Sequence, residues 1–252
     1  MTVHEYDYKP VFNRILAKGD SGTVGIELEM VFPDEDGLEE FLREFVRLPG
    51  YEKKYYLKGD GSLPEEVSVE VVFMPHHLAR LETSVKEVVN LAQWCGVYPT
   101  HEDAGMHVHV ARPSMSLGAE GAFLIFWNLL EQDALVKLAG RRDGEYNQQQ
   151  ALALRRPFAA LLDEPGHYFR VDARRKETLE VRVFQGTVST EVVMDRTRFV
   201  HAVWAYCKAH PFKPGYAASK DGTPAIWRKL YSLDTVAAWC GAQDKYRQLR
   251  LK

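Results

Sequence analysis

The sequence predicts an α+β protein in which an antiparallel β-sheet carries helices packed on one face. Residues 25–30, 105–110 and 179–183 alternate charged or imidazole side chains with apolar ones. Because alternate residues of a strand share a face, each stretch predicts one polar and one apolar face. Apolar residues at helical spacing lie between the predicted strands. One-sided strands separated by helices are typical of an antiparallel sheet covered on one face only, and we expect the polar face to be free.

The first half of the chain predicts three strands and two helices. Each strand alternates apolar residues with polar ones, and each helix carries an apolar stripe that ends near a glycine. The strands are expected at 24–32, 55–58 and 67–73, the helices at 37–48 and 75–94, and a turn at 59–62.

The second half predicts one more strand, a hairpin and several helices. The strand is expected at 106–110, helices at 117–139 and 149–162 with a loop or lid at 140–150 between them, a hairpin of 168–173 with 178–184, and a helix from Ser189 or Thr190 to about Ala209. Residues 1–23 are interpreted as an N-terminal extension, 24–210 as the catalytic domain and 211–252 as a C-terminal wrap of the same domain.

Composition narrows the class of protein. The chain has 252 residues, of which 46% are hydrophobic, which is enough for one large core. Its net charge of -3 shows no global basic field, so we expect no nucleic-acid partner. The widely spaced Cys95, Cys207 and Cys240 predict buried thiols in a reducing compartment. We find no secretory leader pattern or membrane-spanning run, and therefore expect a cytoplasmic protein.

The polar face is predicted to gather acidic side chains and one histidine. Several carboxylates on one sheet face repel one another unless cations neutralise them. Oxygen donors with a single imidazole suit Mg²⁺ or Mn²⁺ better than zinc. The candidate metal ligands are Glu27, Glu29, Asp60, Glu70, His107 and Glu180.

Four further side chains bring positive or hydrogen-donating groups to the same side: Lys58, His109, Arg170 and Arg182. Metal ions together with such groups favour chemistry on phosphates. A P-loop motif and a GxSxG motif are both absent from the sequence, which disfavours a P-loop nucleotidase and a serine hydrolase.

Each motif also has a structural interpretation. Glu-x-Glu is typical of a solvated strand face, His-x-His of a hydrogen-bonded pair, and Glu180 with Arg182 of a cross-strand charge pair. The shared phase of these motifs in five separate strands favours a functional site, since clustered ionisable groups mark sites.

Five motifs in this order resemble those of the amidoligase family, the carboxylate-amine ligases related to glutamine synthetase and glutamate-cysteine ligase. The motifs are Gly-Ile-Glu-Leu-Glu at 25–29, Lys-Gly-Asp-Gly-Ser-Leu at 58–63, Glu-Val-Val-x-x-Pro at 70–75, Gly-Met-His-Val-His-Val at 105–110, and Thr-Leu-Glu-Val-Arg-x-Phe-x-Gly-Thr at 178–187. Family members usually have a small polar residue before the proline of the third motif, where this chain has Met74, and the difference affects the expected substrate pocket.

The resemblance implies a glutamine-synthetase-like catalytic domain that uses ATP and Mg²⁺, or Mn²⁺, to join a carboxylate to an amine through an acyl phosphate. It implies one ion on Glu29, Glu70 and Asp60 and a second on Glu27, His107 and Glu180. His109 and Arg170 would contact the nucleotide, Arg182 would stabilise the transferred phosphoryl group, and the expected substrates are small-molecule or peptide carboxylates and amines. Lys58 is expected to join Arg182 in catalysis. Two alternatives stay open: a metal-dependent hydrolase using the same carboxylates, and a degenerate domain that only binds nucleotide or a partner protein.

Overall fold

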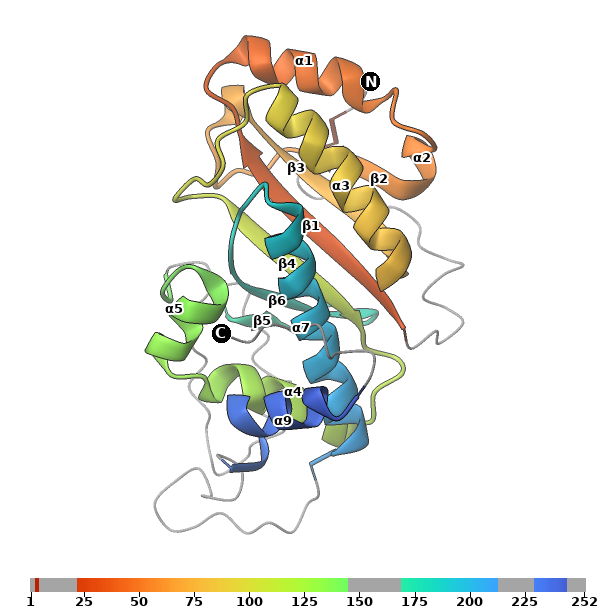
Figure 1. The fold of residues 1–252 in the computed structure, drawn as a ribbon, viewed down its shortest axis with the longest axis vertical. Coiled ribbons are helices and arrows are strands. Elements are labelled where there is room, and N and C mark those ends of the chain that lie inside the picture. The colour runs from red at the N-terminus through yellow and green to blue at the C-terminus, as the bar shows by residue number, and fades with distance from the viewer. Residues whose placement is uncertain (1–2, 5–21, 145–168, 213–228, 244–252) are drawn as a thin grey trace. The chain divides into compact units, whose positions relative to one another are not determined.

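The computed structural model describes residues 3–4, 22–144, 169–212 and 229–243 (Figure 1). These residues form helices and a six-stranded sheet, so the α+β class predicted from the sequence is confirmed. The sheet order is β2-β3-β1-β4-β6-β5, and the strands are β1 Thr23–Val31, β2 Tyr55–Lys58, β3 Ser68–His77, β4 Gly105–Ala111, β5 Val171–Asp172 and β6 Thr178–Gln185.

The described helices connect and flank these strands. They are α1 Glu35–Phe45, α2 Tyr51–Lys54, α3 Leu78–Trp94, α4 Leu117–Leu129, α5 Gln132–Ala139, α7 Thr190–Ala209 and α9 Leu233–Gly241, with a short 3₁₀ turn, η2, at Glu65–Val67. Among the described residues, no helix has both the length and the apolar character needed to cross a bilayer.

The chain divides into two compact units. The first comprises Met1–His109 with Phe184–Thr197, and the second comprises Val110–Val183 with Arg198–Lys252. The chain passes between the units within β4, β6 and α7. Each unit has its own buried core.

In the first unit, β3 pairs antiparallel with both β1 and β2. Helix α3 contacts β3, β1 and α1. Asp34 caps α1 by accepting a hydrogen bond from the Gly37 amide at 2.9 Å, which satisfies one of the open N–H groups at the start of the helix. Four rings in contact, Phe41, Phe45, Tyr55 and Phe73, fill the space between α1 and the strands.

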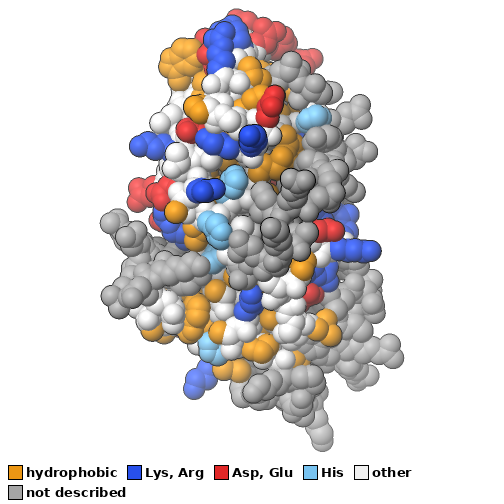
Figure 2. Space-filling model, turned by 90° about the vertical axis from the view of Figure 1, so that its right-hand side faces the viewer, with side chains coloured by type: hydrophobic (Ala, Val, Ile, Leu, Met, Phe, Trp, Pro, Cys, Tyr) orange, Lys and Arg blue, Asp and Glu red, His pale blue; other side chains and the backbone are white. Residues whose placement is uncertain are grey.

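Exposed acidic and basic side chains are intermixed around α1. Arg43 pairs with Glu40 at 3.0 Å and Arg47 with Glu44 at 2.5 Å. The space-filling view shows red and blue side chains together at the end of the molecule that carries α1 (Figure 2). This end therefore presents mixed charge, not the uniform positive field that non-specific nucleic-acid binding needs.

The predicted helix of 117–139 is two helices, and the single long helix was wrong. Residue Leu130 adopts extended backbone angles and ends α4. The Arg170 guanidinium donates to the carbonyl oxygens of Trp127 and Leu130 at 2.9 and 2.8 Å. A cation at the last carbonyls satisfies groups that would otherwise need the next helical turn, so α4 can end while buried. The spacing of apolar residues along 117–139 gives no indication that Arg170 binds the carbonyl oxygens at this helix end.

The boundary between β3 and α3 also differs from prediction. The strand continues through Pro75 to His77, and the helix begins at Leu78 instead of 75. In the β1–β3 register, His76 pairs with Val24 and His77 with Thr23, so both histidines belong to the end of the strand. The other predicted elements within the described residues agree with the structure to within a few positions, apart from the first strand of the hairpin, which is shortened to Val171–Asp172. The helix expected at 149–162 lies outside the described residues.

Candidate active site

A row of charged side chains crosses three strands of the first unit. In the antiparallel registers, Glu70 on β3 pairs with Lys58 on β2 and with Glu29 on β1. The Lys58 Nζ lies 3.1 and 3.3 Å from the two carboxylate oxygens of Glu70. Two carboxylates directly opposite each other destabilise a sheet unless a cation compensates, and Lys58 supplies one positive charge.

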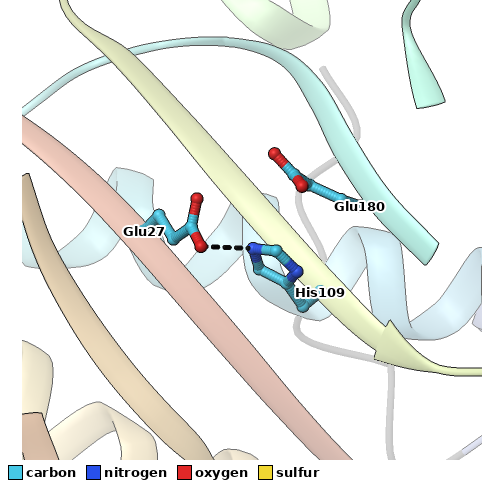
Figure 3. A group of neighbouring side chains, drawn as sticks. All are labelled: Glu27, His109 and Glu180. Atoms are coloured by element: carbon cyan, nitrogen blue, oxygen red, sulfur yellow. Dashed lines mark ion pairs between the residues drawn. The ribbon is translucent and has the colours of Figure 1, made fainter. Parts of the chain in front are cut away.

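Both histidines of β4 contact Glu27 on β1, and Figure 3 shows the contact with His109. His107 Nδ1 lies 3.4 Å from one Glu27 oxygen and His109 Nε2 lies 3.1 Å from the other. His107 Nε2 is also 3.5 Å from Glu29 Oε1, so this ring stands between two carboxylates. The remaining Glu29 oxygen accepts the backbone N–H of Gly105. The His-x-His and Glu-x-Glu motifs therefore form one interlocked group.

The charged face is buried, whereas we expected it to be free. Every residue of this group has at most 8% of its surface exposed; they are Glu27, Glu29, Lys58, Glu70, His107 and His109. Burying charged groups is expensive unless they are paired or bind a metal ion. This burial argues against a merely solvated strand face.

Burial and neighbouring charges shift the pKa values of two of these carboxylates, Glu70 and Glu27, in opposite directions. Burial raises the pKa of Glu70 well above its ordinary value, and the negative charge of Glu27 raises it further against the opposing effect of Lys58. Burial would also raise the pKa of Glu27, but His109 and His107 together hold that pKa well below the ordinary value. Glu27 is therefore ionised, while Glu70 resists ionisation because it is buried beside a second carboxylate.

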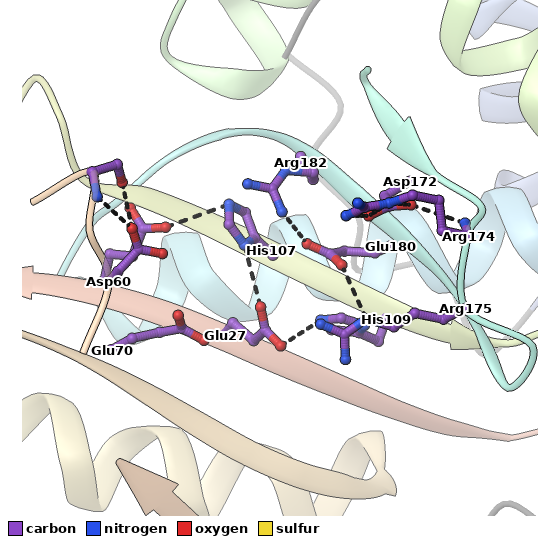
Figure 4. Close-up of polar contacts among 12 residues, drawn as sticks. Glu27, Asp60, Glu70, His107, His109, Asp172, Arg174, Arg175, Glu180 and Arg182 are labelled. Carbon is purple, nitrogen blue, oxygen red and sulfur yellow. Dashed lines mark hydrogen bonds and ion pairs between the residues drawn. The ribbon is translucent and has the colours of Figure 1, made fainter. Parts of the chain in front are cut away.

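The second unit holds a group of ion pairs on the β5–β6 hairpin (Figure 4). Arg182 Nη1 lies 2.6 Å from Glu180 Oε1, within the same strand, so this contact is not the cross-strand pair that the structural interpretation considered. Arg175 Nε lies 3.7 Å from the other Glu180 oxygen. On β5, Asp172 accepts three side-chain hydrogen bonds from Arg174, two at 3.0 Å and one at 2.6 Å.

Two predicted site residues have other partners. Asp60 accepts hydrogen bonds from the Ser62 amide at 2.8 Å and the Ser62 hydroxyl at 2.6 Å, which closes the turn after β2. Arg170 is fully buried and makes a bidentate contact with Asp143, at 2.8 and 2.6 Å, in addition to the α4 carbonyls. Their assignments as metal ligand and nucleotide contact stay predictions.

Three residues with buried or bidentate contacts were not among the predicted site residues: Asp143, Asp172 and Arg141. Asp172 pairs with Glu180 in the β5–β6 register, so the strand pattern could have placed it on the polar face. Asp143 and Arg141 lie in the predicted polar loop, where no periodicity marks a partner.

Comparisons with known proteins give only distant likenesses. No protein-family profile matches the sequence, and no curated protein matches it. Solved structures with a similar arrangement include the complex between the prokaryotic ubiquitin-like protein Pup and its ligase PafA, with a TM-score of 0.45 and 13% identity over 89% of this chain and 59% of that chain. GmaS without ligand gives a TM-score of 0.49 with 12% identity over 94% and 69% of the two chains, and GmaS with ADP gives 0.48 with 11% identity over 94% and 68%. This chain spans less than two thirds of the PafA chain, and the function has to be argued from the side chains themselves.

Proposed function

We propose that the chain is an ATP-dependent carboxylate-amine ligase with a glutamine-synthetase-like catalytic domain at 24–210. ATP would phosphorylate a substrate carboxylate to give an acyl phosphate and ADP, and an amine would then displace phosphate to give an amide. The observation that carries the proposal is the buried group of Glu27, Glu29 and Glu70 with Lys58 and two histidines. The motif resemblance to amidoligases supports it.

The donor set fits hard divalent cations. Three buried carboxylates, those of Glu27, Glu29 and Glu70, supply the oxygen ligands that Mg²⁺ and Mn²⁺ prefer. When bound, Mg²⁺ would neutralise this face and the phosphates of ATP. Following the resemblance, we assign Glu29, Glu70 and Asp60 to one ion and Glu27, His107 and Glu180 to another.

The cationic side chains supply the remaining functions. Lys58 holds Glu70 in place and adds a fixed positive charge to the face. Arg182 would stabilise charge on the transferred phosphoryl group, and His109 would contact the nucleotide. Arg182 is oriented by its contact with Glu180, which matters because a misplaced guanidinium loses most of its effect.

A metal-dependent hydrolase is the second candidate, because the same carboxylates also suit metal activation of water. It would release product without consuming ATP. A nucleotide-binding domain without activity is the third, and the retention of three mutually repelling buried carboxylates argues against it. We expect a cytoplasmic enzyme acting on small-molecule or peptide substrates.

The test is to trap the acyl phosphate. The full chain is incubated with Mg-ATP, hydroxylamine and pools of amino acids and peptides, while ADP release and hydroxamate formation are measured. Glu27→Gln should reduce both by roughly 10- to 100-fold, since it removes the charge of a metal ligand but keeps its shape. Glu39→Gln, an exposed site on α1, is the matched control and should behave as wild type.

Two results would contradict the proposal. One is a wild-type chain that does not bind Mg-ATP at millimolar concentration. The other is product release from esters or amides at the same rate with and without ATP, which would favour the hydrolase.

A further inference from the structure

We propose that Arg141 is a positioning residue that fixes the strand backbone beneath Arg182. This inference deepens the proposed function and rests on it, because it assigns Arg141 a role through a residue of the phosphate site. All the contacts that carry it lie within the second unit.

Strand β6 extends beyond its partner at this point. β5 comprises only Val171–Asp172, and just before it the Arg170 carbonyl oxygen accepts a hydrogen bond from the Arg182 amide at 2.9 Å. Arg141 continues the pairing where β5 ends. Its Nη2 donates to the Arg182 carbonyl oxygen at 2.8 Å and its Nε to the Val183 carbonyl oxygen at 3.2 Å.

Both hydrogen-bonding groups of the Arg182 backbone therefore have partners, the amide with the Arg170 carbonyl oxygen and the carbonyl oxygen with the Arg141 side chain. A guanidinium can span two successive carbonyls because its donors form a rigid planar fork. A lysine ammonium at the same place offers a single point charge on a flexible stem and cannot reproduce this geometry.

The segment that carries Arg141 is itself firmly attached. Gly140 ends α5 in the left-handed region, at φ 81°, with its amide bonded to the Val136 carbonyl oxygen. Two residues after Arg141, Asp143 accepts the bidentate contact from Arg170, whose remaining donors hold the end of α4. The Arg141 guanidinium thus couples the backbone of Arg182 to two helix ends, not to a loose surface loop.

The consequence is that the direction of the Arg182 side chain depends on Arg141. The Arg182 side chain lies beside that of Glu180 on β6, with its Nη1 2.6 Å from Glu180 Oε1. This contact requires the strand backbone to keep its conformation. Small shifts in the placement of a phosphate-binding group reduce its effect steeply. Arg141 therefore acts on ATP only through Arg182.

The experiment measures Mg-ATP affinity by calorimetry on the full chain. The variants are Arg141→Met, Arg182→Met, the double variant, and Arg142→Met as the matched exposed control on the next residue. We expect Arg141→Met to weaken Mg-ATP binding roughly 10-fold. The double variant should bind no more weakly than Arg182→Met alone, because coupled residues are not additive. The control should stay within about twofold of wild type.

Each outcome decides the matter. Equal affinity of Arg141→Met and Arg142→Met, or additive losses in the double variant, would overturn the inference and leave the proposed function intact. Absence of Mg-ATP binding by the wild-type chain would overturn the proposed function, and this inference with it. If Arg141→Met does not fold, Arg141→Lys takes its place, with an expected loss between those of wild type and Arg182→Met.

Discussion

Glu70 occupies the least favourable electrostatic position of the site for a carboxylate. It is buried, faces Glu29 across the β1–β3 pair and has Lys58 as its near cation. Because burial and then the charge of Glu27 raise its pKa, the folded state binds a proton there more tightly than the unfolded chain does. Stability contributed by this group is therefore lost as the pH rises above the unfolded pKa.

Removing the Lys58 charge should make the stability of the protein fall more steeply as the pH rises. We expect Lys58→Met to lower the free energy of unfolding by about 3 kcal/mol near pH 8, because it removes the cation that offsets the burial of the Glu70 carboxylate. The loss should be smaller near about pH 5, where Glu70 can stay protonated in the folded chain. Urea denaturation at both pH values measures the difference, with Lys53→Met on the exposed side of α2 as control. A loss independent of pH would contradict the assigned electrostatics.

Asp172 should show the opposite dependence on pH. Burial would raise its pKa, but the hydrogen bonds and charge of Arg174 outweigh burial and lower it. Stability from this pair is thus present above the unfolded pKa of about 3.9 and lost as the pH falls through the folded pKa. Asp172→Asn should cost about 1 kcal/mol near pH 7 and much less near pH 3, by thermal or urea unfolding. Asp36→Asn, exposed on α1, should show no such change with pH.

At the scale of elements, strand alternation was sufficient to locate the charged face. Alternation with a period of two predicted one polar face that carries Glu27, Glu29, Glu70 and the histidines of β4. The structure brings these side chains together in the first unit. The helix break at Leu130 and the anchors Arg141 and Asp143 could not be predicted in this way. Their partners are backbone carbonyls or side chains distant in sequence, and local periodicity contains no information about such contacts.

The start of α4 packs closely against the segment that follows α7. The Phe212 amide donates to the Gly118 carbonyl oxygen at 2.9 Å, and a Cβ placed at Gly118 would stand 2.5 Å from the Phe212 carbonyl oxygen. That approach is shorter than packed atoms tolerate, so the backbone of Phe212 would have to move. Gly118 is therefore required for this contact.

We expect Gly118→Ala to lower the free energy of unfolding by about 1 to 3 kcal/mol through overpacking. Gly241 is the matched control, because it also lies in a helix and no heavy atom of the described residues stands within 4 Å of a Cβ built there. Gly241→Ala should leave stability unchanged or raise it by about 0.5 kcal/mol. Thermal unfolding of both variants measures the contrast, and equal effects would show that the Phe212 contact is not tight.

At the scale of the whole molecule, the proposed reaction requires residues from both compact units. The carboxylates of β1 and β3 belong to the first unit, whereas Glu180 and Arg182 belong to the second. Each unit keeps its own ion pairs, so each group could be explained separately as structural.

Hydrogen exchange with Mg-ATP tests this requirement. A ligand at 100 times its Kd stabilises the state that binds it by about 2.7 kcal/mol, which slows exchange roughly 100-fold wherever opening releases the ligand. With Mg-ATP we expect slowed exchange in peptides that cover Thr23–Val31, Ser68–His77 and Thr178–Gln185. When EDTA removes the metal, ATP should slow exchange in these peptides very little. Glu27→Gln should abolish the effect in both units, whereas Glu39→Gln should retain it. Protection confined to Thr178–Gln185 would mean that the carboxylates of the first unit serve stability alone, since a nucleotide bound through metal ions on those carboxylates has to be released before β1 and β3 can open.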